Sequence, residues 1–300
     1  MPEKSRGLID RLAFVILNFK TPDETIQLVH NLEKQAWSSK VKVYIVDNGS
    51  ADHSLEVFQR LESTIEVEVI ASKRNLGFAK GHNLGIQKAR LDGFQWIIVS
   101  NSDIRLKIDP DFVRKMEVAY EEDGEIAVIA PTIVNLHGMH QNPFRKERFS
   151  RKEIIKMKLF YLSGFYKLYY FLRVYILYDL ITYIARKRLQ RAVASHRYSQ
   201  VTESGYIYAP HGSFLIFTPT FFKYFDGFDE GTFLYCEEFI LAEKLREKGL
   251  KCWYENQLNI EHQESKATEK LTGNYREKVK FTLKYTLNSC AYFTNMIRFK

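Results

Sequence analysis

The sequence predicts an α/β fold, with a mostly parallel open sheet and flanking helices, and two patterns in its first 130 residues support this class. Five short runs are rich in β-branched residues and nearly continuous in hydrophobicity, as expected of strands buried on both faces of a parallel sheet. Amphipathic segments lie between them, and strands that alternate with helices favour a doubly wound domain. With 300 residues, 45% of them hydrophobic, the chain can bury the core that such a domain needs.

The elements are expected in the following order. The first strands are AFVILNF (13–19), VKVYIV (41–46), VEVIA (67–71), WIIVS (96–100) and IAVIA (126–130), and the helices between them are 22–36, 52–61 and 78–90. After residue 205 come four more strand-like runs, YIYAP, SFLIFTP, KCWYE and LNIEH, and then a helical tail at roughly 274–292. The chain is therefore expected to divide into a first half (1–140), an insert (141–203), a second half (204–268) and a tail (269–300).

The bulk composition excludes several classes of protein. Three scattered cysteines are too few for a disulfide framework and lack zinc-site spacing, which favours a reducing, cytoplasmic compartment. We expect no secretory signal and no spanning helix, because no charge-free apolar run approaches roughly 20 residues. The net charge of +8 comes from one stretch, since residues 145–197 hold 14 Lys and Arg against three acidic residues.

Polar loops follow three of the expected strands and are candidate site loops, because ligands of open α/β sheets bind at the carboxyl ends of strands. They are NFKTPDE, DNGSADHS and SNSDIR. Asp103 in the third loop can hold a divalent cation that bridges a diphosphate. Asp47 in the second can accept a hydrogen bond from the N–H of a base. Taken one at a time, each loop is also explained as a plain turn, with Ser50 or Asp52 capping the next helix.

Three further motifs are ambiguous when taken alone. The stretch RNLGFAKGHNLG is neither a Walker loop nor a dinucleotide fingerprint. His211 and Gly212 stand before a strand-like run, and His262 ends one. A lone histidine is more often structural than a ligand, so neither position by itself indicates a site.

Two adjacent glutamates begin the helix in FLYCEEFILAEKLREKGL. At about 100° per residue, Glu238 falls in the apolar stripe of Leu241, Ala242 and Leu245, whereas Glu237 falls on the polar flank. An unpaired charge on a buried face is costly, so the position of Glu238 calls for an explanation beyond helix packing. The alternative is a capping pair on an ordinary helix.

The order of these motifs resembles one family. A strand followed by DNGS, then RNLGFAKGHNLG, a strand followed by NSD, DGFDEGTFLYCEE and a strand ending in His resemble the inverting glycosyltransferases of family 2, which have the A-type nucleotide-sugar-binding fold. The resemblance covers roughly residues 12–136 and 205–268, and bacterial enzymes of capsule or O-antigen synthesis, including rhamnosyl- and galactofuranosyltransferases, are the most similar.

The resemblance implies a role for each matching residue. Glu238 aligns with the catalytic base, with Glu237 beside it, and His211 and Gly212 lie on the acceptor side. Asn101 to Asp103 occupy the place of the Asp-x-Asp-like metal motif, so Asp103, helped by His262, would hold Mg²⁺ or Mn²⁺. The residues implied in donor binding are Asn18, Asp47, Asn48, Arg74, Asn75, Gly77, Asn83, Asn101 and Asp103, with Asp47 facing the base.

The implied reaction transfers a sugar, with inversion, from a dTDP- or UDP-sugar to a hydroxyl of a polyprenyl-diphosphate-linked glycan. Rhamnose is the favoured sugar, and uridine and thymidine donors stay open because they share the base edge that Asp47 would read. The alternative from another class is a non-catalytic, membrane-associated subunit that binds a nucleotide-sugar or a glycan. Asp103, Glu238 and His262 argue against it.

The basic insert contains ten Phe or Tyr residues between Phe160 and Tyr183. Aromatic and aliphatic side chains flanked by Lys and Arg suit helices that lie in a membrane interface, so we expect a peripheral protein on the anionic inner face of the cell membrane. The alternatives are a buried helical subdomain or a homodimer surface. Nucleic acid is not expected as a partner, because the aromatic residues come with Leu and Ile at helical density.

Overall fold

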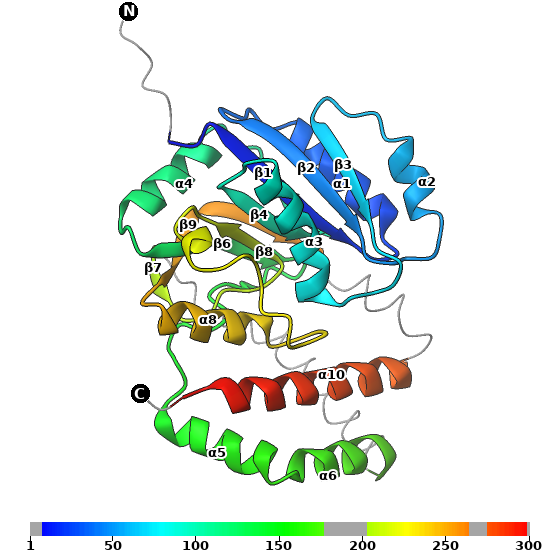
Figure 1. Cartoon of the computed structure of the whole chain (residues 1–300), viewed down its shortest axis with the longest axis vertical. Helices are drawn as coiled ribbons and strands as arrows, with labels where there is room; N and C mark the ends of the chain where they lie inside the picture. The colour runs from blue at the N-terminus through cyan, green and yellow to red at the C-terminus, as the bar shows by residue number, and fades with distance from the viewer. Residues whose placement is uncertain (1–7, 177–202, 264–274, 299–300) are drawn as a thin grey trace, which may run out of the picture.

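The computed structural model describes residues 8–176, 203–263 and 275–298, and its hydrophobic runs form a nine-stranded sheet with helices on both faces (Figure 1). The strands and helices expected in the first half are confirmed. The strands are β1 (Arg11–Asn18), β2 (Lys40–Asp47), β3 (Glu66–Ala71), β4 (Ile97–Asn101) and β6 (Ile126–Asn135). The helices are α1 (Pro22–Glu33), α2 (Ser54–Gln59) and α3 (Phe78–Leu91).

Two further elements of the first half were not expected from the sequence: β5 (Ile104–Leu106) and α4 (Phe112–Glu121). The second half contains β7 (Gly205–Ile207), β8 (Phe214–Phe217), the short helix η2 (Phe221–Lys223), α8 (Glu237–Glu247) and β9 (Lys251–His262). The prediction of separate strands in KCWYE and LNIEH is wrong. They form the single strand β9, which bulges where its pairing with β6 shifts between Pro131 and Thr132.

The strand order is β3-β2-β1-β4-β8-β6-β9-β5, with β7 paired to β9. The first four strands are parallel, as predicted. Beyond them the sheet is mixed: β8 runs antiparallel to β4 and β6, while β9 is parallel to β6 and antiparallel to β5. Hydrophobicity patterns do not encode strand direction, so only the structure shows where the parallel part ends.

Alternating residues of the strands fill two apolar layers, one on each face of the sheet. Phe14 and Ile16 of β1 belong to the layer that contains Leu28 of α1 and Met116 of α4. On the other face the layer includes side chains of β1, β2, α3 and α8, among them Val15, Val46, Ile86 and Leu241. The strand ends, and with them the site loops, are therefore held between two packed layers.

A second layer of helices covers the outer side of α8. It consists of α5 (Arg151–Leu162), α6 (Phe165–Phe171), the π-helical segment η1 (Leu172–Ile176) and α10 (Tyr275–Met296), which confirms the expected helical tail (Figure 1). Ile240 of α8 packs with Ile154 of α5 and Phe293 of α10. The expected insert and tail extend over residues 177–202 and 269–274, which lie outside the described residues. None of the described helices is both long and apolar enough to cross a membrane.

Candidate functional site

Polar residues end three neighbouring parallel strands on one edge of the sheet. Asn18 pairs in register with Asp47, and Leu17, the residue before Asn18, pairs with Asn101. Because parallel strands end together, the loops after β1, β2 and β4 lie side by side, as the sequence predicts.

Asn18 is fully buried and fixes the orientation of Asp47. Its Nδ2 donates to Asp47 Oδ1 at 2.8 Å and to Ser50 Oγ at 3.1 Å, while its Oδ1 accepts from Thr21 N at 3.2 Å. Ser50 also donates to Asp47 through its hydroxyl and, at 3.3 Å, through its backbone N–H. Sequence reasoning weighed Ser50 only as a helix cap, although it belongs to the DNGS motif. Ser50 and Asn18 both bond to Oδ1 of Asp47, whereas among the described residues Oδ2 has one long hydrogen bond, from Ser50 N.

The loop that contains Arg74 and Asn75 packs tightly on the loop after β2. Asn48 Nδ2 donates to the Gly77 carbonyl at 2.9 Å, and Asn75 Oδ1 accepts from Gly77 N at 2.8 Å. Gly49 has φ +70°, and a Cβ there would lie 2.2 Å from the Arg74 carbonyl carbon, so no larger residue fits. Asn48 and Asn75 therefore shape the loop, and the exposed Arg74 is the member that faces outward.

The start of α3 is docked on the segment that precedes the two glutamates. Gly77 has φ +85°, and a Cβ would lie 2.1 Å from the Phe233 carbonyl oxygen, which accepts from Phe78 N at 2.9 Å. Asn83, expected at the donor, uses its amide on the turn at Phe228, through Nδ2 to the carbonyl at 3.0 Å and Oδ1 from the N–H at 2.8 Å. Asn83 thus ties α3 to the GFDE stretch.

Asp103 and His262 come together because β5 pairs with the end of β9, where Ile104 stands opposite His262. Asp103 Oδ1 lies 3.3 Å from His262 Nε2, and both side chains are nearly buried. Gln141 Oε1 accepts a hydrogen bond from His262 Nδ1 at 2.8 Å, which orients the ring with Nε2 toward the carboxylate. Gln141 comes from the segment after β6, where no sequence pattern singles it out.

This pair fits a divalent cation by the chemistry of its atoms: a carboxylate oxygen and an imidazole nitrogen whose tautomer is fixed by Gln141. Within the described ranges no group of three or more His, Cys, Asp or Glu residues could hold a metal. Mg²⁺ or Mn²⁺ on Asp103 and His262 would therefore take its remaining ligands from a bound substrate and water.

His211 and Gly212 connect this pair to the glutamates. The His211 ring lies 5.6 Å from the His262 ring; its Nδ1 accepts a hydrogen bond from Ser213 N at 3.3 Å and lies 2.9 Å from Ser213 Oγ. Burial, followed by the nearby His262, lowers the pKa of His211 to about 4, so the ring is neutral near pH 7. Gly212 N donates to Glu238 Oε1 at 3.3 Å, and a Cβ on Gly212 would lie 3.0 Å from that oxygen.

The two glutamates differ from what the helical wheel predicts. Glu237 is buried, with 7% exposed, and Glu238 is half-buried. The predicted polar flank is also partly buried, since Glu243 is 1% exposed. The reason is tertiary: α8 has the sheet on one side and the second helix layer on the other, so both sides of the helix face protein.

The backbone before the glutamates is strained. Tyr235 and Cys236 have φ of 71° and 65°, a conformation that is costly for residues other than glycine. Cys236 Sγ also contacts Cys290 Sγ of α10 at 2.7 Å, a pair that their separation in the sequence conceals. The contact with Cys290 helps to hold this strained turn, which sets the direction of the first residues of α8.

Burial raises the pKa of both carboxyl groups. For Glu237 burial and then the charge of Glu238 raise the pKa to about 8, and within the described residues its Oε1 has no hydrogen-bond partner. For Glu238 burial raises the pKa, while the backbone N–H groups of Glu238 itself and of Gly212 lower it. Of the two, Glu238 is thus the one equipped to be ionised, with the proton held on Glu237.

Solved structures share this fold. Over 86% of the chain, GalNAc-T7, crystallised with UDP, GalNAc and Mn²⁺, aligns with a TM-score of 0.55 and 15% identity. Staphylococcus aureus TarS 1–349 in complex with UDP aligns over 85% with a TM-score of 0.53 and 12% identity. The chain spans 44% and 61% of these two structures, about half their length. Such low identities support the A-type glycosyltransferase fold alone.

A comparison with family models identifies the family of the chain, whereas a comparison with individual curated proteins does not. No curated protein matches the chain. The family model described as "Glycosyl transferase family 2" matches residues 14–197, more than half of the chain. The chain that carries these polar strand ends therefore belongs to glycosyl transferase family 2.

Proposed function

We propose that this protein is an inverting glycosyltransferase that moves a sugar from a nucleotide diphosphate to a hydroxyl acceptor. The observation that carries the proposal is the line of contacts from Asp103 through His262, His211 and Gly212 to Glu238. It brings the residues suited to a diphosphate next to a carboxylate suited to a hydroxyl. A non-catalytic binding subunit would have no use for that proximity.

The chemistry follows from these residues. Glu238 accepts the proton of the acceptor hydroxyl while that oxygen bonds to the anomeric carbon from the face opposite the diphosphate. The bond from the anomeric carbon to the diphosphate oxygen breaks, so the configuration inverts and a nucleoside diphosphate leaves. The proton on Glu237 removes a second negative charge, which keeps Glu238 ionised and able to act as base. A divalent cation held by Asp103 and His262 supplies charge stabilisation to the diphosphate when bound.

The donor is a nucleoside diphosphate sugar, either dTDP- or UDP-linked, with rhamnose favoured. Asp47 would read the base through Oδ2, and Arg74 lies exposed on the loop packed against it. UDP in the GalNAc-T7 structure and UDP-GlcNAc in a TarS structure support a uridine donor. Mn²⁺ in the former supports a divalent cation.

The acceptor is a polyprenyl-diphosphate-linked glycan of surface polysaccharide synthesis, such as capsule or O-antigen, at the cytoplasmic face of the membrane. The apolar and basic helices beside α8 support this choice, because they lie next to the helix that carries Glu238.

Thermal stability with UDP, dTDP, GDP and CMP, each with and without Mn²⁺, tests the donor site. A ligand at 100 times its dissociation constant adds about 2.7 kcal/mol to the free energy of unfolding. We expect a Mn²⁺-dependent rise of the melting temperature with UDP or dTDP, and its loss in Asp103→Asn. The absence of a shift with every nucleotide would contradict the proposal and favour a non-catalytic subunit.

Turnover tests the base in the same preparation. Glu238→Gln is expected to keep the nucleotide-induced shift and lose 10²–10⁴-fold in kcat, as removal of a general base does. Normal turnover by Glu238→Gln would contradict the assignment.

A further inference from the structure

The solvent-facing side of α5 is apolar. Ile155, Leu159 and Leu162 are 42%, 67% and 61% exposed, and their spacing of four and three residues places them on one side of the helix. Ile154 lies at 1% exposure on the side that packs against α8 and α10. This helix is therefore apolar both toward the core and toward solvent.

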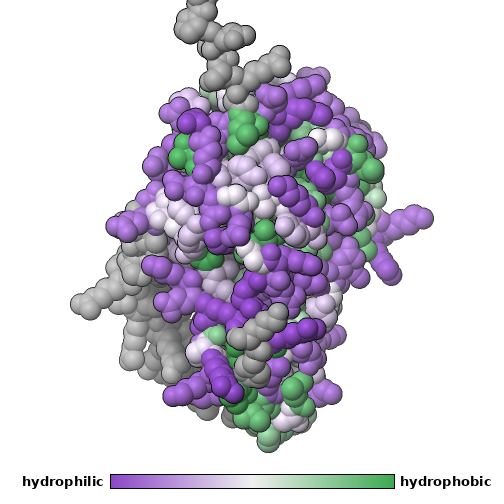
Figure 2. Space-filling model, turned by 60° about the vertical axis from the view of Figure 1, so that its left-hand side comes forward, coloured by the Kyte–Doolittle hydropathy of each residue, from purple (hydrophilic) through white to green (hydrophobic). Residues whose placement is uncertain are grey.

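The apolar side continues along α6 and η1. We call the whole surface the α5–α6 face: its exposed members are Ile155, Leu159, Leu162, Phe165, Leu168, Tyr169, Phe171, Tyr175 and Ile176. Figure 2 shows hydrophobic residues gathered at the end of the molecule where α5 and α6 lie. Single exposed apolar residues are common on soluble proteins, but a contiguous series over three consecutive elements marks an interaction surface.

The same segment is strongly basic. Residues 145–176 contain nine Lys and Arg against two Glu. Lys152 and Lys156 are exposed beside Ile155. One of the two glutamates, Glu153, is paired with Arg145 at 2.8 Å and caps α5 with Ser150. The apolar side is thus bordered by positive charge.

A cavity of about 310 Å³ opens between α6 and α10, and two more lysines line it. Its lining comprises Tyr166, Lys167, Tyr170, Lys284, Leu287 and Asn288. Among the described residues neither Lys167 nor Lys284 is paired with a carboxylate; each ammonium lies only over the ring of its neighbouring tyrosine. Two unpaired ammonium groups between aromatic rings suit an anionic head group.

We propose that the α5–α6 face docks on an anionic membrane surface, with its apolar residues among the lipid chains and the lysines of the α6–α10 cavity at lipid phosphates. Apolar residues bordered by Lys and Arg are the pattern of helices that lie in the interface. A second copy of the chain is a less suitable occupant, because a two-fold dimer would bring two basic surfaces together and their like charges would repel. The docking does not depend on the proposed activity.

Flotation of the purified protein with vesicles tests the docking. Vesicles of phosphatidylcholine containing about a third phosphatidylglycerol should carry the protein upward, and pure phosphatidylcholine should carry at least about tenfold less. The triple variant Leu159→Glu, Leu162→Glu and Phe165→Glu should lose the binding. The matched control is Leu91→Glu, Ile108→Glu and Leu136→Glu, which changes three apolar residues exposed by 84%, 67% and 69% away from this face and should float as the wild type does.

The double variant Lys167→Glu and Lys284→Glu tests the cavity and should lower binding to the anionic vesicles without changing the melting temperature. A retained melting temperature also shows that the face variants are folded. Failure of the wild type to float with anionic vesicles would overturn the proposal, and so would equal flotation on pure phosphatidylcholine. Equal loss of binding in the matched control would overturn it as well. Dimerisation abolished by the triple variant, measured by light scattering, would assign the face to a second copy instead.

Discussion

The two neighbouring carboxyl groups at the start of α8 have different surroundings, although they are chemically the same. Gly212 donates a hydrogen bond to Glu238, whereas Glu237 is more buried and its Oε1 has no partner among the described residues. At the scale of single residues, these contacts distinguish Glu237, which keeps its proton, from Glu238, which is the more readily ionised of the two.

The raised pKa of Glu237 makes stability depend on pH. The folded protein keeps this proton up to about pH 8, while the unfolded chain releases it near 4.5, so stability falls as pH rises between these values. Glu237→Gln removes this pH dependence. We expect the variant and the wild type to have the same free energy of unfolding near pH 4. Above that pH the free energy of unfolding of the variant should exceed that of the wild type by an amount that grows on the order of 1 kcal/mol per pH unit up to pH 8.

Denaturant unfolding at pH 4, 6 and 8 measures this gain. Glu247→Gln, on the exposed end of the same helix, is the control and should show no such trend. A constant difference between wild type and Glu237→Gln over the whole range would contradict the raised pKa.

At the scale of elements, a buried ion pair joins α8 to the segment before α5. Arg148 Nε and Nη2 donate to the two oxygens of Glu243 at 2.7 and 3.0 Å, and Nη2 also reaches the Arg298 carbonyl at 2.8 Å. Tyr208 and Arg246 contact the same carboxylate. The Arg148 guanidinium therefore links α8 to the segment before α5 and to the chain after α10.

Arg148→Met should destabilise the protein by about 2–3 kcal/mol, below the full loss of a buried pair because Arg246 stays in place. Adding Glu243→Met should recover part of the loss, since two apolar side chains then replace two charges. Arg114→Met is the comparison with a smaller expected effect, because the Arg114 side chain is 61% exposed where it pairs with Glu117 and Glu121. Equal destabilisation by Arg148→Met and Arg114→Met, measured with urea, would contradict this role.

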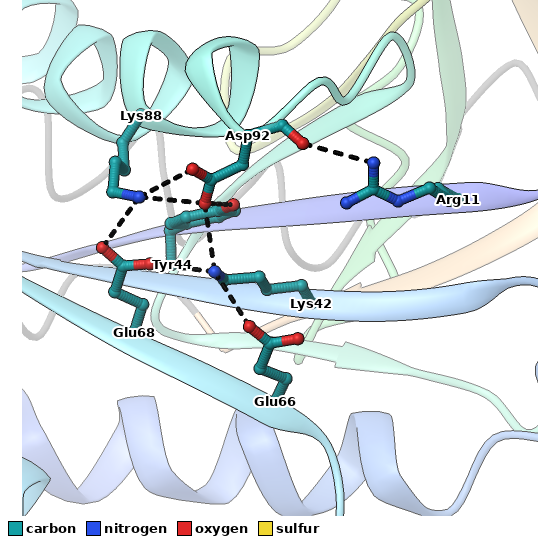
Figure 3. Close-up of polar contacts among 7 residues, drawn as sticks. All are labelled: Arg11, Lys42, Tyr44, Glu66, Glu68, Lys88 and Asp92. Atoms are coloured by element: carbon teal, nitrogen blue, oxygen red, sulfur yellow. Dashed lines mark hydrogen bonds and ion pairs between the residues drawn. The ribbon is translucent and has the colours of Figure 1, made fainter.

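At the scale of the whole molecule, the edge of the sheet far from the helix layer is held by charge (Figure 3). Lys42 of β2 lies 2.9 Å from Glu66 and from Glu68 of the edge strand β3, and 3.0 Å from Asp92 after α3. Lys88 contacts Asp92 at 2.7 Å. These contacts lower the pKa of Asp92, chiefly through Lys88, and the pKa of Glu66, chiefly through Lys42.

Carboxyl groups with lowered pKa stabilise the fold above their ordinary pKa, and this stabilisation is lost as pH falls through the lowered value. Lys42→Met should therefore lower the melting temperature near pH 7 and flatten the decline between pH 4 and pH 2. Lys34→Met is the control, because Lys34 lies at the end of α1, outside this network. A melting curve of Lys42→Met that declines with acid as steeply as the wild type would contradict the network's role.

The sequence by itself determined the elements that are local. Continuous β-branched runs place β1, β2, β3 and β4, and their polar ends place Asn18, Asp47 and Asn101 at one edge, because these features depend only on neighbours in the chain. The motif order also identified the family, which the family model confirms.

Only the tertiary structure decided the features that depend on distant contacts. The burial of Glu237 and Glu243 requires a second helix layer that a wheel drawn for one helix cannot include. Gln141 contacts His262 across 121 residues in the sequence, and the amide of Asn83 bonds to the Phe228 backbone. Strand direction, burial and hydrogen-bond partners are set by how elements pack, and packing is a property of the whole chain rather than of any window within it.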